Sequence, residues 1–151
     1  MSRFQVHFDL PDLLSVQQMA ARIALHLKRG DVLQLKGDLG VGKTTFTRAL
    51  IHALAGHALE VPSPTFTIVQ QYDLPQFMLC HFDLYRLKHS NELIEVGLEQ
   101  ALSEGVAVLE WPELAAEFLP QDSSLVLEFF WIGQGRAVQI YAPASWEHLS
   151  L

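Results

Sequence analysis

The stretch VLQLKGDLGVGKTTF, residues 32–46, determines how the rest of the chain is interpreted. The apolar residues among 32–35 predict a short strand, and Gly37–Thr44 fits the phosphate-loop pattern G-x-x-x-x-G-K-[ST]. A helix is expected from Lys43 to Ala55, because Gly56 follows as a helix stop signal. A strand, a glycine-rich loop and a helix in this order predict a site for the phosphates of a nucleotide and leave the base open.

Each residue type in this loop has a physical task. Glycines let the backbone approach a phosphate closely, so that successive N–H groups can face it. Lys43 adds a positive charge toward the β and γ oxygens, and the helix directs its positive N-terminal end at the same anion. We expect Thr44 to offer its hydroxyl to Mg²⁺ and Thr45 to donate to an α-phosphate oxygen. The expected nucleotide-binding residues of this segment are Asp38, Leu39, Gly40, Val41, Gly42, Lys43, Thr44 and Thr45.

Two carboxylates at the ends of apolar stretches are candidates to complete the site. Asp83 ends an expected strand that starts at Phe77, and Glu110 directly follows the apolar run Val106–Leu109. Parallel strands deliver such residues to the ligand crevice at their carboxyl ends, so we expect Asp83 to be the second magnesium carboxylate. Glu110 either orients the attacking water or joins the magnesium ligands. The alternative for both residues is a carboxylate that only caps the following helix or turn.

Three neighbouring side chains have a chemical and a structural interpretation. His81 shares a strand face with Asp83, and it either lies near the γ-phosphate or is a buried structural histidine. Trp111 either stacks on a base or a partner, or is half-buried packing. Cys80 faces the other side of its strand, where a small buried residue needs no chemical role.

Outside the loop, the apolar pattern predicts an α/β fold. Residues 4–10 alternate as a strand does, and a helical stripe follows, opened by Asp12 or by the box Ser15–Gln18. The further expected elements are strands at 65–72 and 77–83 that pair antiparallel, a helical stretch at 90–104 interrupted at Gly97, a helix from Pro112, and a hairpin of 125–132 with 137–141. We expect a P-loop NTPase-like three-layer fold with a mixed, largely parallel central sheet and an antiparallel C-terminal hairpin, as a single domain over residues 1–151.

The composition is that of a folded, acidic chain. Of the 151 residues, 50% are hydrophobic and 18% are charged, which provides a core and argues against disorder. The net charge of −7 disfavours direct tight binding to nucleic acid, so that any RNA is expected to be reached through a partner. Residues 1–88 carry +2 and residues 89–151 carry −9, which makes the C-terminal half either a solvated face or a docking surface for a basic partner. One cysteine, no leader and no membrane-length apolar run predict a soluble cytoplasmic protein.

Four segments in this order resemble one known family. They are GDLGVGKTTFTRAL at 37–50, SPTFTIVQQY at 63–72, HFDLYRL at 81–87 and VLEWPE at 108–113. With them, nearly the whole chain up to about residue 136 resembles the TsaE (YjeE) family, the P-loop ATPases of bacterial threonylcarbamoyladenosine tRNA modification. The resemblance implies an ATP-binding and hydrolysing, magnesium-dependent protein. It would act with TsaB and TsaD, which modify the adenosine next to the anticodon, while hydrolysis assembles or resets the complex rather than transferring the group.

The resemblance also implies roles for individual residues. Lys43 and Thr44 would hold phosphate and Mg²⁺, Asp83 would be the second magnesium-shell acid, and Glu110 with Trp111 would be needed for hydrolysis. Ser63-Pro64-Thr65 would be a switch-like segment in which Thr65 senses the γ-phosphate. The family contacts the nucleobase near 11–15 and 135–136, where this sequence departs from the family pattern; Leu13 and Gly135 are the candidates there.

Three other functions remain alternatives at this level. A small-molecule kinase uses the same loop but usually needs a basic lid and an acceptor pocket, and no inserted lid is visible. A regulatory GTPase would carry an Asn-Lys-x-Asp element, which this sequence lacks. A nucleotide-dependent binding module would hydrolyse ATP too slowly to matter without a partner.

Overall fold

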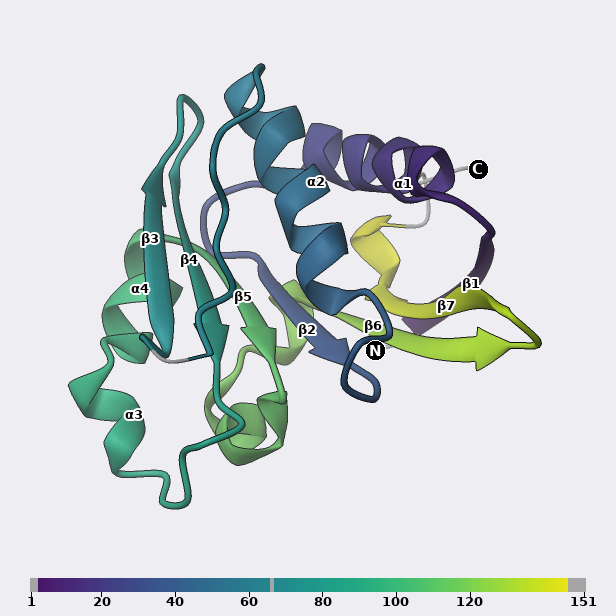
Figure 1. Ribbon diagram of the computed structural model, residues 1–151. Helices are drawn as coiled ribbons and strands as arrows, with labels where there is room; N and C mark the ends of the chain where they lie inside the picture. The colour runs from purple at the N-terminus through teal and green to yellow at the C-terminus, as the bar shows by residue number, and fades with distance from the viewer. Residues whose placement is uncertain (1–2, 66, 147–151) are drawn as a thin grey trace.

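The computed structural model describes residues 3–65 and 67–146. Within these residues the chain forms a seven-stranded sheet in the order β1-β7-β6-β2-β5-β4-β3 (Figure 1). The strands are β1 (Arg3–Leu10), β2 (Val32–Lys36), β3 (Val69–Asp73), β4 (Met78–Asp83), β5 (Gly105–Glu110), β6 (Ser124–Ile132) and β7 (Gly135–Pro143). The strand that precedes the phosphate loop, β2, is therefore the central strand of the sheet.

The sheet is mixed, as expected, and its parallel part is the middle. Strands β6, β2, β5 and β4 are joined by three parallel pairings, whereas β1 with β7, β7 with β6, and β3 with β4 pair antiparallel. The arrowheads of β2, β4 and β5 point to the same edge of the sheet in Figure 1. Residues that end these strands are thereby brought to one place.

Helices cover both faces of the sheet and make three layers. They are α1 (Leu13–His26), α2 (Lys43–Ala55), α3 (Glu92–Glu95), α4 (Leu98–Glu104) and the 3-10 helices η1 (Pro112–Phe118), η2 (Gln121–Ser123) and η3 (Ala144–Trp146). On one face α1 and α2 pack side by side, and Ile23 and Phe46 belong to the same buried cluster as Leu35 of β2. On the other face Leu98 of α4 packs in a second cluster with Leu109 of β5, to which η1 also contributes. No helix of the described ranges is long and apolar enough to cross a lipid bilayer.

Local signals set the ends of the two long helices. Asp12 is the N-cap of α1, because its carboxylate accepts the N–H of Ser15 at 2.9 Å, so the first of the two expected helix starts is the right one. Helix α2 has the predicted bounds. It ends at Gly56, whose φ of +82° suits glycine and whose N–H donates to the carbonyl of His52 at 3.0 Å.

The expected strand at 65–72 is wrong at its start. Strand β3 begins only at Val69, and Phe66 lies outside the described residues. The N–H of Ile68 donates to the carbonyl of Pro64 at 2.6 Å, and Ile68 has a φ of +71°, so the chain turns here instead of extending. The expected helix from Pro112 is a 3-10 helix, and Gly97, with a φ of +80°, separates α3 from α4 as predicted.

Candidate functional site

The phosphate loop connects β2 to α2 and depends on its glycines. Gly37, Gly40 and Gly42 have φ values of +142°, +79° and +112°, which side chains other than glycine rarely adopt. At Gly37 there is also no room for a side chain, since a Cβ would lie 2.7 Å from the carbonyl oxygen of Phe129. At Gly40 nothing lies within 4 Å of a Cβ position. The first glycine is therefore required by packing against β6, and the second leaves open space above the loop.

Helix α2 presents an uncapped N-terminus to a cavity. The N–H groups of Lys43, Thr44 and Thr45 belong to the first turn, which has no intrahelical acceptors, and the N-cap residue Gly42 has no side chain to satisfy them. The cavity has a volume of about 250 Å³. Its lining residues are Leu39, Gly40, Gly42, Lys43, Thr44, Thr45, Ser63, Thr65, Asp83, Glu110 and Trp111. An anion in this cavity would meet unpaired N–H groups and the positive end of the helix dipole.

Most of the sequence-predicted residues meet in this cavity. Asp38, Val41, Leu13 and Gly135 are not among the lining residues. Val41 is fully buried in the core beneath the loop, and Leu13 is 56% exposed at the start of α1. Gly135 begins β7, next to Arg136, which pairs in register with Leu10 at the end of β1. The two segments proposed for the nucleobase therefore approach each other beside the loop: a Cβ on Gly42 would lie 3.8 Å from Nη1 of Arg136.

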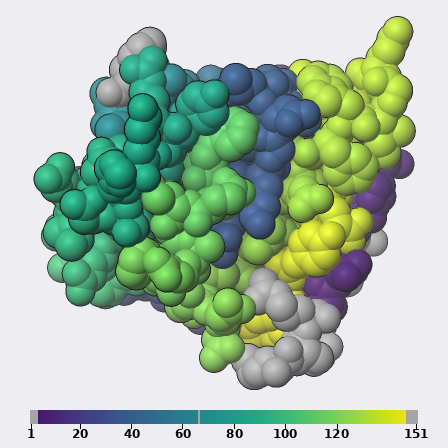
Figure 2. Space-filling model, turned by 90° about the horizontal axis from the view of Figure 1, so that it is seen from below, coloured from purple at the N-terminus to yellow at the C-terminus, as the bar shows by residue number. Residues whose placement is uncertain are grey.

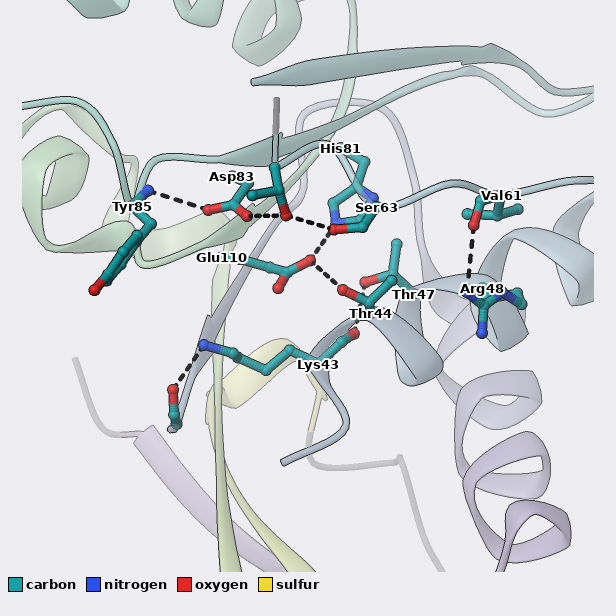
Figure 3. A network of polar contacts seen from close by, with 12 residues as sticks. Lys43, Thr44, Thr47, Arg48, Val61, Ser63, His81, Asp83, Tyr85 and Glu110 are labelled. Atoms are coloured by element: carbon teal, nitrogen blue, oxygen red, sulfur yellow. Dashed lines mark hydrogen bonds and ion pairs between the residues drawn. The ribbon is translucent and has the colours of Figure 1, made fainter. Parts of the chain in front are cut away.

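The Lys43 side chain lies across the loop. It is 4% exposed (Figure 3). Its Nζ donates to the carbonyl of Gly37 at 2.6 Å and lies 3.7 Å from the centre of the Trp111 ring. Burial lowers the pKa of Lys43 from its ordinary value, and the negative charges of Glu110 and Asp83 oppose that shift. This buried ammonium, which contacts a carbonyl and a ring, can bind an anion that enters the cavity.

Glu110 joins the loop to the sheet. Its Oε2 accepts a hydrogen bond from Oγ1 of Thr44 at 3.0 Å and another from Nε2 of His81 at 2.6 Å (Figure 3). Because an ionised carboxylate only accepts, Nε2 of His81 carries the hydrogen. Glu110 is 5% exposed and His81 is fully buried, and among the described residues Nδ1 of His81 has no partner. His81 thus holds Glu110 from within the core and does not line the cavity. Of the two interpretations, this position favours a buried structural histidine over one beside the γ-phosphate.

Asp83 has different partners from Glu110, although the two are register partners across β4 and β5. Its Oδ2 accepts from Oγ1 of Thr65 at 3.3 Å, and its Oδ1 accepts from the N–H of Tyr85 at 3.1 Å. The hydroxyls of Thr65 and Ser63 lie 2.8 Å apart. Asp83 is therefore connected to the segment that follows Val61, whereas Glu110 is connected to the phosphate loop.

Trp111 and Tyr85 form an aromatic pair, of which the sequence analysis predicted only Trp111 as a site residue. Trp111 has a φ of +57°, and its ring lies 4.9 Å from that of Tyr85, centre to centre. Lys43 covers the tryptophan, as described above. Tyr85 was not among the predicted site residues, and the only signal for it was its place in the segment HFDLYRL. The two rings meet at a tilt of 52° and join the segments that follow β4 and β5, and the Trp111 ring lies beside the loop lysine.

The oxygen donors at this site suit a small hard cation. Thr44 contributes a hydroxyl and Glu110 and Asp83 contribute carboxylates, the ligand types that Mg²⁺ prefers. Across 3–65 and 67–146, no three His, Cys, Asp or Glu residues gather closely enough to hold a metal by themselves. Mg²⁺ is commonly bound by one or two carboxylates together with substrate phosphates, so this donor set fits a magnesium–nucleotide complex.

Comparison with known proteins gives consistent matches over most of the chain. Residues 10–136 match the family model described as "Threonylcarbamoyl adenosine biosynthesis protein TsaE". A tRNA threonylcarbamoyladenosine biosynthesis protein TsaE from Rickettsia bellii is 43% identical over 104 residues, 69% of this chain and 72% of that protein. The protein of the same name from Haemophilus influenzae is 36% identical over 123 residues, 78% of this chain and 77% of that protein. The crystal structure of YdiB from Bacillus subtilis superposes with a TM-score of 0.76 at 31% identity, covering 99% of this chain and 93% of that one.

Proposed function

Because this chain belongs to the TsaE family, we propose that it is a magnesium-dependent ATPase of tRNA threonylcarbamoyladenosine biosynthesis that acts with TsaB and TsaD. The observation that carries the proposal is the 3.0 Å hydrogen bond from Thr44 at the start of α2 to Glu110 at the end of β5. A loop hydroxyl beside a strand-end carboxylate is the arrangement with which phosphate-loop hydrolases hold magnesium and nucleotide.

The chain's own groups divide the work of binding. The N–H groups at the start of α2 and the ammonium of Lys43 take the phosphate oxygens, and Lys43 exchanges its contact with the Gly37 carbonyl for one of them. Thr44, while donating to Glu110, keeps its oxygen lone pairs for the cation. When bound, Mg²⁺ supplies charge neutralisation on the β and γ oxygens.

Glu110 is the residue to which we assign the attacking water. Its Oε2 is occupied by Thr44 and His81, which fix the orientation of the carboxylate. Its Oε1 is then the acceptor that orients a water toward the γ-phosphate and takes its proton. Thr65, bonded to Asp83, is placed to report the γ-phosphate to the segment that contains Ser63.

We further propose that the nucleotide state controls assembly with TsaB and TsaD, and that hydrolysis resets the complex. The tRNA is reached through these partners, in keeping with a net charge of −7 on the chain. The hydroxyl pair Ser63–Thr65 supports this step, because it links the surface segment before β3 to a carboxylate in the cavity.

The test is ATP hydrolysis by the purified chain with Mg²⁺, measured alone and with the TsaB–TsaD pair. A low basal rate that rises with the pair is expected. Glu110→Gln should lower kcat about 100-fold or more, since it removes the water-orienting charge. Glu104→Gln is the matched control, because this exposed carboxylate at the end of α4 does not line the cavity. Equal rates for the two variants would refute the role of Glu110, and unchanged ATP affinity in Lys43→Ala would refute the phosphate loop assignment.

A further inference from the structure

A second hollow, distinct from the nucleotide cavity, lies between α3, α4 and η1. Its volume is about 430 Å³, and its lining residues are Ser90, Asn91, Leu93, Ile94, Leu98, Glu99, Leu102 and Phe118. None of these residues lines the nucleotide cavity. Ile94 on α3 is 75% exposed and Phe118 at the end of η1 is 51% exposed, so large apolar side chains stand in water on two walls of the hollow. Leu93 and Leu98 form its buried floor.

The segments around this hollow are acidic. Residues 90–122 contain eight Asp and Glu and no Lys or Arg. Of these acids Glu99 lines the hollow, whereas Glu110 belongs to the nucleotide cavity. Glu95 and Glu99 are exposed on the α3–α4 side, and Glu113 and Glu117 are exposed on η1. The nearest basic residue before this stretch is Lys88, which precedes α3. An apolar floor with one sign of charge around it favours a ligand of complementary pattern, apolar in the centre and basic at its flanks.

The walls also indicate the backbone form of that ligand. Six of the eight lining residues belong to α3, α4 and η1, and Ser90 and Asn91 directly precede α3. The strands at the two ends of the sheet order, β1 and β3, contribute no lining residue. An extended peptide that adds to a sheet edge would find no backbone ladder here, but a helix can lay an apolar stripe into such a groove. We infer that the α3–α4–η1 groove is a docking site for an amphipathic helix of a partner protein, with an apolar stripe flanked by Lys or Arg.

The groove has a physical connection to the nucleotide cavity. The chain leaves Asp83 and reaches the groove wall at Ser90, and it leaves Glu110 and enters η1 at Pro112 (Figure 1). Figure 2, which views the molecule from below, shows the teal and green segments of this region beside the blue segment of the phosphate loop. A helix that contacts both walls would hold together the two segments that follow the cavity carboxylates. This part rests on the proposed function, because it assigns the helix to the TsaB–TsaD pair and predicts that docking stimulates hydrolysis.

The experiment measures binding of the full chain to the purified TsaB–TsaD pair with ATP and Mg²⁺, by biolayer interferometry. Ile94→Glu and Phe118→Glu should each weaken binding more than tenfold and abolish stimulation by the pair, while the basal ATPase rate stays unchanged. Leu25→Glu is the control, since Leu25 is 82% exposed on α1, at the opposite face of the sheet. Glu95→Lys with Glu99→Lys should weaken binding about tenfold at 50 mM salt and less at 300 mM. Thermal unfolding of each variant verifies that it is folded.

The outcomes separate this inference from the proposed function. Loss of binding in the groove variants with normal binding of Leu25→Glu supports the groove. Equal binding of all folded variants overturns the groove and leaves the ATPase and its partners in place. Absence of binding by the unmodified chain overturns both the partner assignment and the groove as its docking site.

Discussion

Substitution of the first and the second loop glycine by alanine should have opposite consequences for stability and for nucleotide binding. Gly37 has a φ of +142°, and its Cβ would lie 2.7 Å from the carbonyl oxygen of Phe129 and 2.8 Å from Cγ1 of Val41. The unfavourable backbone conformation costs about 1–3 kcal/mol of unfolding free energy, and the steric overlap adds about 1–3 kcal/mol. Gly40 shares the positive φ, at +79°, but its Cβ would meet nothing within 4 Å. Gly37→Ala should therefore be less stable than Gly40→Ala by about 1–3 kcal/mol.

Among folded molecules, Gly40→Ala should bind nucleotide more weakly than Gly37→Ala. Gly40 lines the cavity that we propose for the nucleotide and Gly37 does not, so a methyl group at Gly40 would occupy the space that we assign to the phosphates. Urea unfolding followed by tryptophan fluorescence gives the stabilities, and titration with a fluorescent ATP analogue gives the affinities. The comparison cancels the effect of alanine on the unfolded chain, because both variants replace glycine by alanine. Equal stability of the two variants would refute the overlap at Gly37, and unimpaired nucleotide binding by Gly40→Ala would refute the placement of the phosphates.

Three further predictions concern buried groups. His81→Ala should lower the kcat for ATP about tenfold or more and change its KM little, because one hydrogen bond to the Glu110 carboxylate is lost outside the cavity. Steady-state kinetics test this prediction, and a change in KM alone would contradict it. Burial raises the pKa of Asp31, so the folded state favours the protonated form and the charged form costs stability once the pH exceeds the raised pKa. Asp31→Asn should accordingly raise Tm by about 2–4 °C at pH 7, with a difference that shrinks toward pH 4 in thermal melts, since its amide oxygen can still accept the Lys28 N–H. Burial also raises the pKa of the Cys80 thiol, so Ellman's reagent should label native protein far more slowly than protein in urea; equal rates would place the thiol at the surface.

The elements around the phosphate loop were predictable because their determinants are local. The apolar residues of β2, the loop glycines and the stop at Gly56 lie within 25 residues, Val32 to Gly56, and the predicted bounds of α2 are those observed. The start of β3 was not predictable in this way. Alternation favours a strand from Thr65, whereas the turn closed by Ile68 onto Pro64 overrides that preference.

The candidate site, like the fold, has features that local sequence sets and features that tertiary contacts set. By itself the sequence determined which residue types are present and where each lies along its own element: a loop lysine, a helix-start threonine and two strand-end carboxylates. Only the tertiary structure decided which of them touch. Thr44 and Glu110 are 66 positions apart, and the order β2-β5-β4 and the register of these strands place Glu110 under Thr44 and turn Asp83 toward Thr65. The physical reason is that periodicity and turn chemistry act between near neighbours in the chain, whereas strand order and register are set by burial of the whole sheet between its two helical layers.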